Sequence, residues 1–226
     1  MRIYLLNLSE AADFTVERYL PLISEARRRE IFRFQREKDR RAKILAEILA
    51  RELAAAEMGC SVEEIQLERD ERGKPWLVNS PLQISLSHSS NWVACSISAA
   101  RNGVDVEENF SDALEIAKSF FAPTEYLLLQ RLYGDELRRK FLSLWTLKES
   151  YAKFLGTGID EKILRLDIKE LQSRANVFCQ NFYLEDGAAV GFSAEGSEPG
   201  CEIKFIKIGG ARQENDWLYK LERRRR

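Results

Sequence analysis

Residues 103–107 read Gly-Val-Asp-Val-Glu and predict a short strand at the point where the second half of the chain begins. Successive side chains of a strand point to opposite faces, so Val104 and Val106 lie on one face and Asp105 and Glu107 on the other. Two carboxylates about 7 Å apart on one face can converge on a hard cation such as Mg²⁺, which takes oxygen ligands. The same pattern also fits an exposed strand whose polar face meets water, and the stretch alone leaves both interpretations open.

The residues before this strand predict helices followed by strands. Residues 24–58 carry apolar side chains at helical spacing, in two pieces around Arg36–Asp39, and Gly59 marks the expected end. Two short strands are predicted next, because apolar and polar residues alternate over Leu82–Leu86 and Val93–Ile97. This half therefore combines a long helical segment with a small sheet.

The second half repeats the order of helices and then strands. Helical periodicity covers residues 111–133, with an interruption near 122–125, and a second helix covers residues 135–155. Gly156 and Gly158 end that helix. The segment after it predicts a strand meander over residues 165–208, with turns at Asp186-Gly187 and near Pro199-Gly200.

This repeated order predicts an α+β protein of two similar α/β modules, with helices packed on small, mainly antiparallel sheets. Asn102-Gly103 is typical of a hairpin turn because both residues tolerate positive φ, so we place the boundary there. The modules are then residues 1–102 and residues 103–226, and we expect pseudo-two-fold symmetry between them. Only the order of the elements carries this expectation, since the residues themselves show no repeat.

The composition excludes several classes of protein. With 226 residues, of which 45% are hydrophobic and 31% charged, the chain is neither disordered nor of low complexity. A formal net charge of −1 argues against a protein held to nucleic acid by net positive charge. The four cysteines are far apart and there is one histidine, which argues against a zinc site. No stretch approaches the ~18 apolar residues of a membrane span, so we expect a cytoplasmic protein without membrane or nucleic-acid partners.

Charge is distributed unevenly along the chain. Residues 27–51 contain ten Lys or Arg and four Asp or Glu, whereas residues 104–115 contain five acids and no base. A basic and an acidic region in one chain fit a site that holds both a phosphate and a cation. They also fit two solvated faces of opposite sign, and the sequence leaves that alternative open.

Trp145, Glu149 and Lys153 are spaced i, i+4 and i+8, so they lie on one side of a helix. An exposed Glu–Lys pair of this kind contributes only about 0.2–0.5 kcal/mol. However, Trp145 on this side, with Tyr151 and Phe154 beside it, indicates a partly buried face whose charged groups need partners. A cation shared with the 103–107 strand suits Glu149, and a phosphate suits Lys153.

Two further motifs offer contacts for an anion. Gly73-Lys74-Pro75 predicts a fixed loop with a projecting amine, and Ser87-His88-Ser89 ends a predicted strand with hydroxyl, imidazole and backbone N–H groups. The sequence has no P-loop and no GxSxG motif. A catalytic triad could use only His88, whose serine neighbours on the same strand end are poorly placed as nucleophiles.

Taken in order, these motifs closely resemble the 4′-phosphopantetheinyl transferases of the surfactin-synthetase-activating (Sfp) type. The resemblance covers about residues 28–168, and the chain length resembles the two-module members rather than the half-length, trimeric ones. It is carried by Gly73-Lys74-Pro75, Leu86-Ser87-His88-Ser89, Gly103-Val104-Asp105-Val106-Glu107 and Trp145-Thr146-Leu147-Lys148-Glu149-Ser150-Tyr151-Ala152-Lys153.

The resemblance implies transfer of the 4′-phosphopantetheine group of coenzyme A to a serine of an acyl or peptidyl carrier protein, with release of 3′,5′-ADP. It implies that Mg²⁺ is held by Asp105, Glu107 and Glu149. It further implies that Glu149 is the general base, directly or through water, and that Lys153 stabilises the transferred phosphate. The first module is expected to hold the coenzyme A nucleotide, and the second the metal and the carrier.

The remaining contacts to coenzyme A follow from the same resemblance. Ser87 and His88 resemble the phosphate contacts of the family, and Lys74 resembles a lysine near the adenine nucleotide. For the 3′-phosphate, the family commonly has an arginine three residues after an aspartate. In this chain that position, counted from Asp39, is Ala42. The candidates are therefore neighbouring basic residues, namely Arg36, Arg41 and Lys43.

The resemblance also places the docking surface for an acidic carrier domain near Ile116–Leu128, with Phe120, Phe121, Tyr126, Leu127 and Leu128 as its apolar part. Ordinary helix core is the alternative for those side chains. A monomer is expected, because both halves of the site lie in one chain. Two other functions remain open: a Mg²⁺-dependent nuclease or phosphodiesterase, and an inactive coenzyme A or carrier-binding module.

Overall fold

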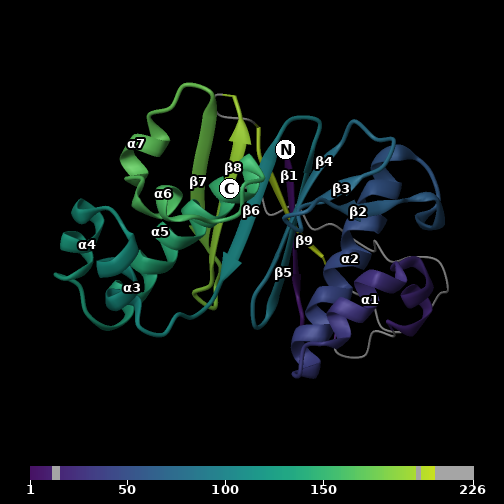
Figure 1. Cartoon of the computed structure of the whole chain (residues 1–226), viewed down its shortest axis with the longest axis horizontal. Coiled ribbons are helices and arrows are strands. Elements are labelled where there is room, and N and C mark those ends of the chain that lie inside the picture. Colours follow the sequence, from purple (N-terminus) through teal and green to yellow (C-terminus); the bar gives the residue numbers. More distant parts are fainter. Residues whose placement is uncertain (12–15, 197–199, 207–226) are drawn as a thin grey trace.

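The computed structural model describes residues 1–11, 16–196 and 200–206. Figure 1 shows helices α1 and α2 on one side of the molecule, helices α3 to α7 on the other, and the two larger sheets between them. Within the described residues, no helix combines the length and the apolar composition needed to cross a bilayer. The α+β fold class predicted from the sequence is confirmed.

The first half contains the two helical pieces and the two strands that the sequence predicts, and also strands β1, β2 and β3 and two short 3-10 helices that it does not. Helices α1 and α2 are separated at residues 33–36, and Gly59 ends α2 in the left-handed conformation at φ 67°. Ser24 begins α1 by accepting the backbone N–H of Arg27 at 3.3 Å, which is the usual cap of a helix start. The elements are β1 (Arg2–Asn7), η1 (Glu17–Leu22), α1 (Glu25–Phe32), α2 (Glu37–Met58), η2 (Val62–Glu64), β2 (Leu67–Arg69), β3 (Pro75–Leu77), β4 (Gln83–His88) and β5 (Trp92–Ser98).

In the second half, the helix predicted over 111–133 is divided at 121–122, as its sequence indicates. The tail differs from the predicted meander, because residues 165–172 lie in two short helices, each begun by an aspartate cap at Asp160 or Asp167. The elements are β6 (Asn102–Glu107), α3 (Ala113–Phe120), α4 (Pro123–Leu129), α5 (Gly134–Leu155), α6 (Glu161–Arg165), α7 (Ile168–Gln172), β7 (Val177–Tyr183), β8 (Ala189–Glu195) and β9 (Glu202–Ile206).

Three sheets connect these elements, in the strand orders β4-β5-β1-β9, β2-β3 and β6-β8-β7. Every pairing is antiparallel except that of β1 with β9, so the mainly antiparallel sheets are confirmed. The turn at Asp186-Gly187 joins β7 to β8 as predicted, with Gly187 at φ 85°. The predicted turn near Pro199-Gly200 lies partly outside the described residues. The module boundary and the pseudo-two-fold symmetry stay predictions.

The two larger sheets pack against each other through the apolar faces of their strands. In β1, Ile3 and Leu5 point to this central layer, whereas Tyr4 and Leu6 point to the layer beneath α2, as the alternation of a strand requires. Val104 and Val106 of β6 enter the central layer from the other sheet and are fully buried. Asp105 and Glu107 therefore face away from it, as the sequence predicts.

The hairpin turn predicted at Asn102-Gly103 is wrong. Both residues lie within β6, which pairs with β8 rather than with β5, and Gly103 does not have positive φ. A Cβ at Gly103 would lie 2.6 Å from the backbone nitrogen of Phe154, and closer still to the carbonyl oxygen of Ser150. Glycine is required here because helix α5 passes directly over β6, not because the chain turns.

We predict that Gly103→Ala destabilises the fold by about 1–3 kcal/mol or more, because the new methyl group meets rigid backbone of α5. Urea denaturation followed by circular dichroism measures this change. Gly200→Ala is the matched control, since a Cβ there has no atom within 4 Å and its φ is not positive. Equal stability of the two variants would contradict the close approach of α5 to β6.

Candidate active site

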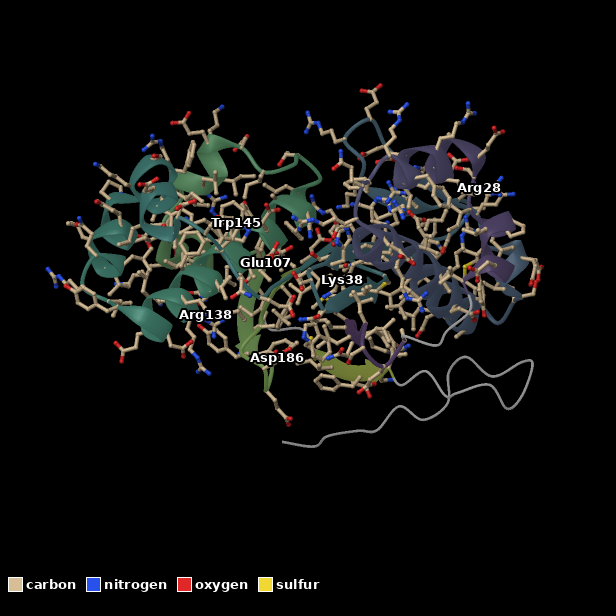
Figure 2. All side chains as sticks on the ribbon, turned by 90° about the horizontal axis from the view of Figure 1, so that it is seen from below. Arg28, Lys38, Glu107, Arg138, Trp145 and Asp186 are labelled. Atoms are coloured by element: carbon tan, nitrogen blue, oxygen red, sulfur yellow. The ribbon has the colours of Figure 1, made fainter. Side chains whose placement is uncertain are left out.

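A pocket of about 650 Å³ lies between the two halves of the molecule. Helices α1 and α2 and the β2–β3 turn form one wall, and β6 and α5 form the other. Figure 2 shows Glu107 near the middle of the molecule, between the side chains of the two halves. The lining residues are Arg27, Glu30, Lys43, Ala46, Arg69, Asp70, Glu71, Gly73, Leu86, Ser87, His88, Asp105, Glu107, Glu149 and Lys153.

Asp105 is the centre of the acidic end of this pocket and is only 3% exposed. Its Oδ1 accepts a hydrogen bond from Ser87 Oγ at 2.7 Å and forms an ion pair with Lys153 Nζ at 2.7 Å. Its Oδ2 is buried and has no hydrogen-bond partner. A buried carboxylate oxygen without a partner is costly, so this atom is suited to a ligand that enters the pocket.

Glu107 and Glu149 complete a group of three carboxylates at this end. Burial, together with the neighbouring Asp105 and Glu149, raises the pKa of Glu107 to about 8. Burial and Asp105 likewise raise the pKa of Glu149 to about 7, although Lys153 opposes that change. These three carboxylates disfavour one another's negative charge, and a bound cation would relieve that repulsion.

The residue types at this end fit a hard divalent cation, because they supply carboxylate oxygens and one of those oxygens lacks a partner. Across residues 1–11, 16–196 and 200–206, however, no group of three or more His, Cys, Asp or Glu side chains already has the arrangement of a metal site. Lys153 Nζ already pairs with Oδ1 of Asp105, so Oδ2 is the oxygen of this carboxylate without a partner. A metal would therefore bind only with adjustment of these side chains.

His88 lies between the acidic and the basic ends. Lys43 Nζ is 3.0 Å from His88 Nε2 and 4.2 Å from the centroid of the Phe34 ring. Burial, and then the charges of Lys43, Lys153 and other cations, lower the pKa of His88 to about 4. The imidazole is therefore neutral at pH 7, and because Nε2 accepts from Lys43, Nδ1 carries the proton.

The basic end is organised by a buried carboxylate that the sequence reasoning missed. Glu47 accepts from Arg27 Nε at 2.7 Å and from Arg69 Nη2 at 2.5 Å, and its side chain is 3% exposed. Arg69 was missed as well, and its sequence context carries no signal. Glu47 could have been found, because it is the one acid in the apolar stretch 44–50. These contacts hold two guanidinium groups at the pocket wall.

Three other basic residues that were predicted to contact coenzyme A lie outside the pocket. Lys74 Nζ donates to the carbonyl oxygen of Lys153 at 2.6 Å and to that of Phe154 at 3.4 Å, at the C-terminal end of α5. Arg41 donates to the carbonyl oxygen of Ala11, and the exposed Arg36 precedes α2. None of these three basic side chains lines the pocket, whereas Lys43 does. Trp145, itself a residue of α5, is half-buried and packs against the core.

The predicted docking segment is partly exposed. Phe120, Leu127 and Leu128 are 43%, 54% and 43% exposed, whereas Phe121 is 2% exposed and stacks on Phe141 in the core. Tyr126 is half-buried. Phe121 is therefore a core residue, which was the alternative to a docking role. The other three, Phe120, Leu127 and Leu128, are accessible at the surface.

Comparison with known proteins identifies both halves of the chain. Residues 9–100 match the family model described as 4′-phosphopantetheinyl transferase, N-terminal, and residues 101–198 match the 4′-phosphopantetheinyl transferase superfamily. The 4′-phosphopantetheinyl transferase Sfp of Bacillus subtilis (strain 168) is 33% identical over 144 residues, which cover 63% of this chain and 64% of the relative. The 4′-phosphopantetheinyl transferase psf-1 of Bacillus pumilus is 31% identical over 164 residues, which cover 70% of each chain.

The chain thus belongs to the 4′-phosphopantetheinyl transferase family, and the resemblance to its Sfp type is confirmed. The match spans 64% of the length of the Bacillus subtilis relative. A crystal structure of a holo-(acyl-carrier-protein) synthase from Bacillus anthracis in complex with CoA (3′,5′-ADP) aligns with 43% of this chain and 97% of its own. The two sequences are 20% identical, and the TM-score of the two structures is 0.31.

We predict that the pH dependence of stability reflects the neutral His88. Its folded-state pKa is about 4, below the ordinary 6.5, so the unfolded chain binds more protons between these values. Stability should therefore fall by about 1–2 kcal/mol between pH 7 and pH 5 on account of this group. His88→Asn should remove that part of the loss.

Two-dimensional NMR of the imidazole measures the pKa directly, and His88 is the one histidine of the sequence, so its signals need no assignment. Urea denaturation at pH 7 and pH 5 measures the loss of stability in both proteins. A midpoint near pH 6.5 for the folded protein would contradict the burial of this ring beside Lys43.

Proposed function

We propose that this protein transfers the 4′-phosphopantetheine group of coenzyme A to a serine hydroxyl of an acyl or peptidyl carrier protein. The observation that carries the proposal is a single pocket lined on one side by three carboxylates and Lys153, and on the other by three basic side chains together with Glu30, Asp70 and Glu71. Such a pocket suits a ligand with a pyrophosphate and a separate phosphate. Relatives named 4′-phosphopantetheinyl transferase support the same activity.

The reaction joins the serine oxygen to the β-phosphorus of coenzyme A and breaks the bond from that phosphorus to the bridging oxygen. The bridging oxygen leaves on 3′,5′-ADP, and the hydroxyl proton passes to a base. Phosphoryl transfer of this kind needs alignment, charge neutralisation and a proton acceptor rather than a covalent intermediate. Each of these needs has a candidate side chain in the pocket.

Asp105, Glu107 and Glu149 would hold Mg²⁺, which neutralises charge on the pyrophosphate when it is bound. The partnerless Oδ2 of Asp105 supports this assignment. Lys153, whose ammonium lies 2.7 Å from Asp105 Oδ1, is suited to contact the transferred phosphate. The Ser87 hydroxyl now donates to Asp105, and the neutral His88 presents an N–H group to an anion.

Glu149 is the proposed general base. It lines the pocket next to Asp105 and Lys153, the groups proposed to act on the reacting phosphate. A carboxylate held at this place can accept the proton of the attacking serine hydroxyl. The proton reaches it directly or through one water.

The 3′-phosphate would bind at the basic end. Lys43, Arg27 and Arg69 line that end, and two of them are held by Glu47. We therefore favour Lys43 over Arg36 and Arg41 among the residues predicted from the sequence. Lys74 would act indirectly, since its ammonium fixes the carbonyl groups at the end of α5.

The remaining assignments follow from this activity. Residues 1–102 would supply the nucleotide side of the site, and residues 103–226 the carboxylates and the carrier side. An acidic carrier domain would dock near Ile116–Leu128. The protein would act as a monomer, because both walls of the pocket come from one chain. It would act in the cytoplasm, without a membrane or nucleic-acid partner.

The proposal is tested by incubating the protein with coenzyme A, Mg²⁺ and several apo carrier domains. We expect mass spectrometry to show one phosphopantetheine added to a carrier serine, and EDTA to prevent the addition. A carrier whose serine is replaced by alanine is the control. Absence of any mass gain across acyl and peptidyl carriers would refute the proposed function.

Asp105→Asn and Glu149→Gln should each reduce transfer roughly 100-fold or more, because either change removes a carboxylate that would hold Mg²⁺ on the pyrophosphate. Glu136→Gln is the matched control, since Glu136 lies on the same helix as Glu149 but is exposed. The measurement is the initial rate of transfer, with circular dichroism to verify folding. A folded Glu149→Gln protein with most of its activity would rule out both roles given to Glu149.

Lys43→Ala should raise KM for coenzyme A by roughly 10-fold, because one ion pair to the 3′-phosphate is lost. It should change KM for 3′-dephospho-coenzyme A much less. Arg36→Ala should leave both values unchanged, since that side chain is exposed outside the pocket. The reverse result would assign the 3′-phosphate to the start of α2 instead.

A further inference from the structure

An ion pair in the second half of the chain has no part in the pocket. Lys148 Nζ lies 2.8 Å from Glu125 Oε2, and the two side chains are 1% and 5% exposed. Lys148 directly precedes Glu149 in α5, yet only Glu149 lines the pocket. A buried ion pair is a weak source of stability in itself, so its geometry is the feature to explain.

This pair connects three segments. Glu125 Oε2 accepts the backbone N–H of Ala122 at 3.2 Å, and Oε1 accepts that of Ile168 at 3.0 Å. Lys148 Nζ also donates to the carbonyl oxygen of Leu166. The start of α4 is thereby tied to α5 and to residues 166–168. A nearby hydrogen bond from Thr124 to Asp167 joins the same two segments.

Helix α4 depends on this connection for its placement. It has seven residues, of which only Glu125 and Leu129 are buried. So short a helix is marginal by itself, and one buried leucine leaves its rotation weakly defined. Glu125 accepts the N–H of Ile168 and pairs with Lys148, and these two contacts fix the rotation of α4 and its place on α5.

The opposite side of α4 is exposed and apolar. Leu127 and Leu128 are 54% and 43% exposed, and Phe120 of α3 is 43% exposed. Figure 1 shows α3 and α4 together at the outer end of this half, away from the sheets. Exposed Lys118 and Arg131 belong to the same region and suit an acidic partner.

We propose that Glu125 and Lys148 are positioning residues that orient α4, so that Leu127 and Leu128 meet the carrier domain. This inference rests on the proposed function and adds a role for residues that touch neither coenzyme A nor the reacting atoms. The ion pair acts on docking of the carrier and not on the pocket.

The test replaces the pair with apolar residues, Glu125→Leu with Lys148→Met, so that no unpaired charge is buried. We expect the double variant to fold, KM for the carrier to rise at least 10-fold, and KM for coenzyme A to stay within twofold of the wild-type value. Glu125→Gln keeps an acceptor for the backbone N–H groups, so its carrier KM should be intermediate. If the double variant does not fold, Glu125→Gln tests the proposal by itself, through its KM for the carrier. Asp135→Asn, which breaks exposed ion pairs of α5, is the control and should change neither KM.

A double-mutant cycle with Leu127→Ser connects the pair to docking. In the wild-type background Leu127→Ser should raise the carrier KM several-fold, and in the double variant it should add little, because α4 is already misplaced. Hydrogen exchange should be faster in residues 122–129 of the double variant and unchanged in β6.

Other outcomes would overturn the inference. A folded double variant with the wild-type carrier KM, or with an equal rise in both KM values, would show that the pair does not position a docking helix. Wild-type protein without transfer to any carrier would refute the proposed function and, with it, this role. The two failures are therefore distinguishable.

Discussion

The close approach of helix α5 to strand β6 is the constraint on which the pocket depends. Gly103 permits it, because any side chain there would meet the backbone of Ser150 and Phe154. On β8, Gly191 does the same beneath Thr146. With the helix this close to the sheet, the carboxylates of β6 and the charged face of α5 share one small space. Acids that are 44 residues apart in sequence, Asp105 and Glu149, thus become electrostatic neighbours.

The arrangement of charges in the pocket lowers the stability of the folded chain. Asp105 keeps one oxygen without a partner, and burial beside other acids raises the pKa values of Glu107 and Glu149. Between the two ends, burial and then the charges of Lys43 and its basic neighbours lower the pKa of His88. Groups held in this way are not optimal for stability alone, but they are oriented before a ligand arrives. Such preorganisation lowers the energy needed to stabilise charge during a reaction.

Local patterns were sufficient to predict most elements, because periodicity and glycine ends determine α2 and α5 and alternation determines β4 and β5. The failures have non-local causes. Asn102-Gly103 has the residues of a turn, yet its glycine serves packing against a helix fifty residues away. The acidic end of the pocket was predicted because its residues lie in recognisable motifs. Arg69 ends the short strand β2 within an ordinary polar stretch of sequence, and only tertiary structure brings it to Glu47.

The parallel pairing of β1 with β9 has a consequence for biosynthesis. Strand β1 pairs with β5 on one edge, and within the described residues its other edge pairs with residues 202–206 of β9. As the chain leaves the ribosome, that second pairing cannot form until residues 202–206 have been translated. An uncovered strand edge can pair with strands of other chains. Until β9 pairs with β1, the nascent protein is therefore prone to aggregation unless chaperones or the ribosome shield this edge.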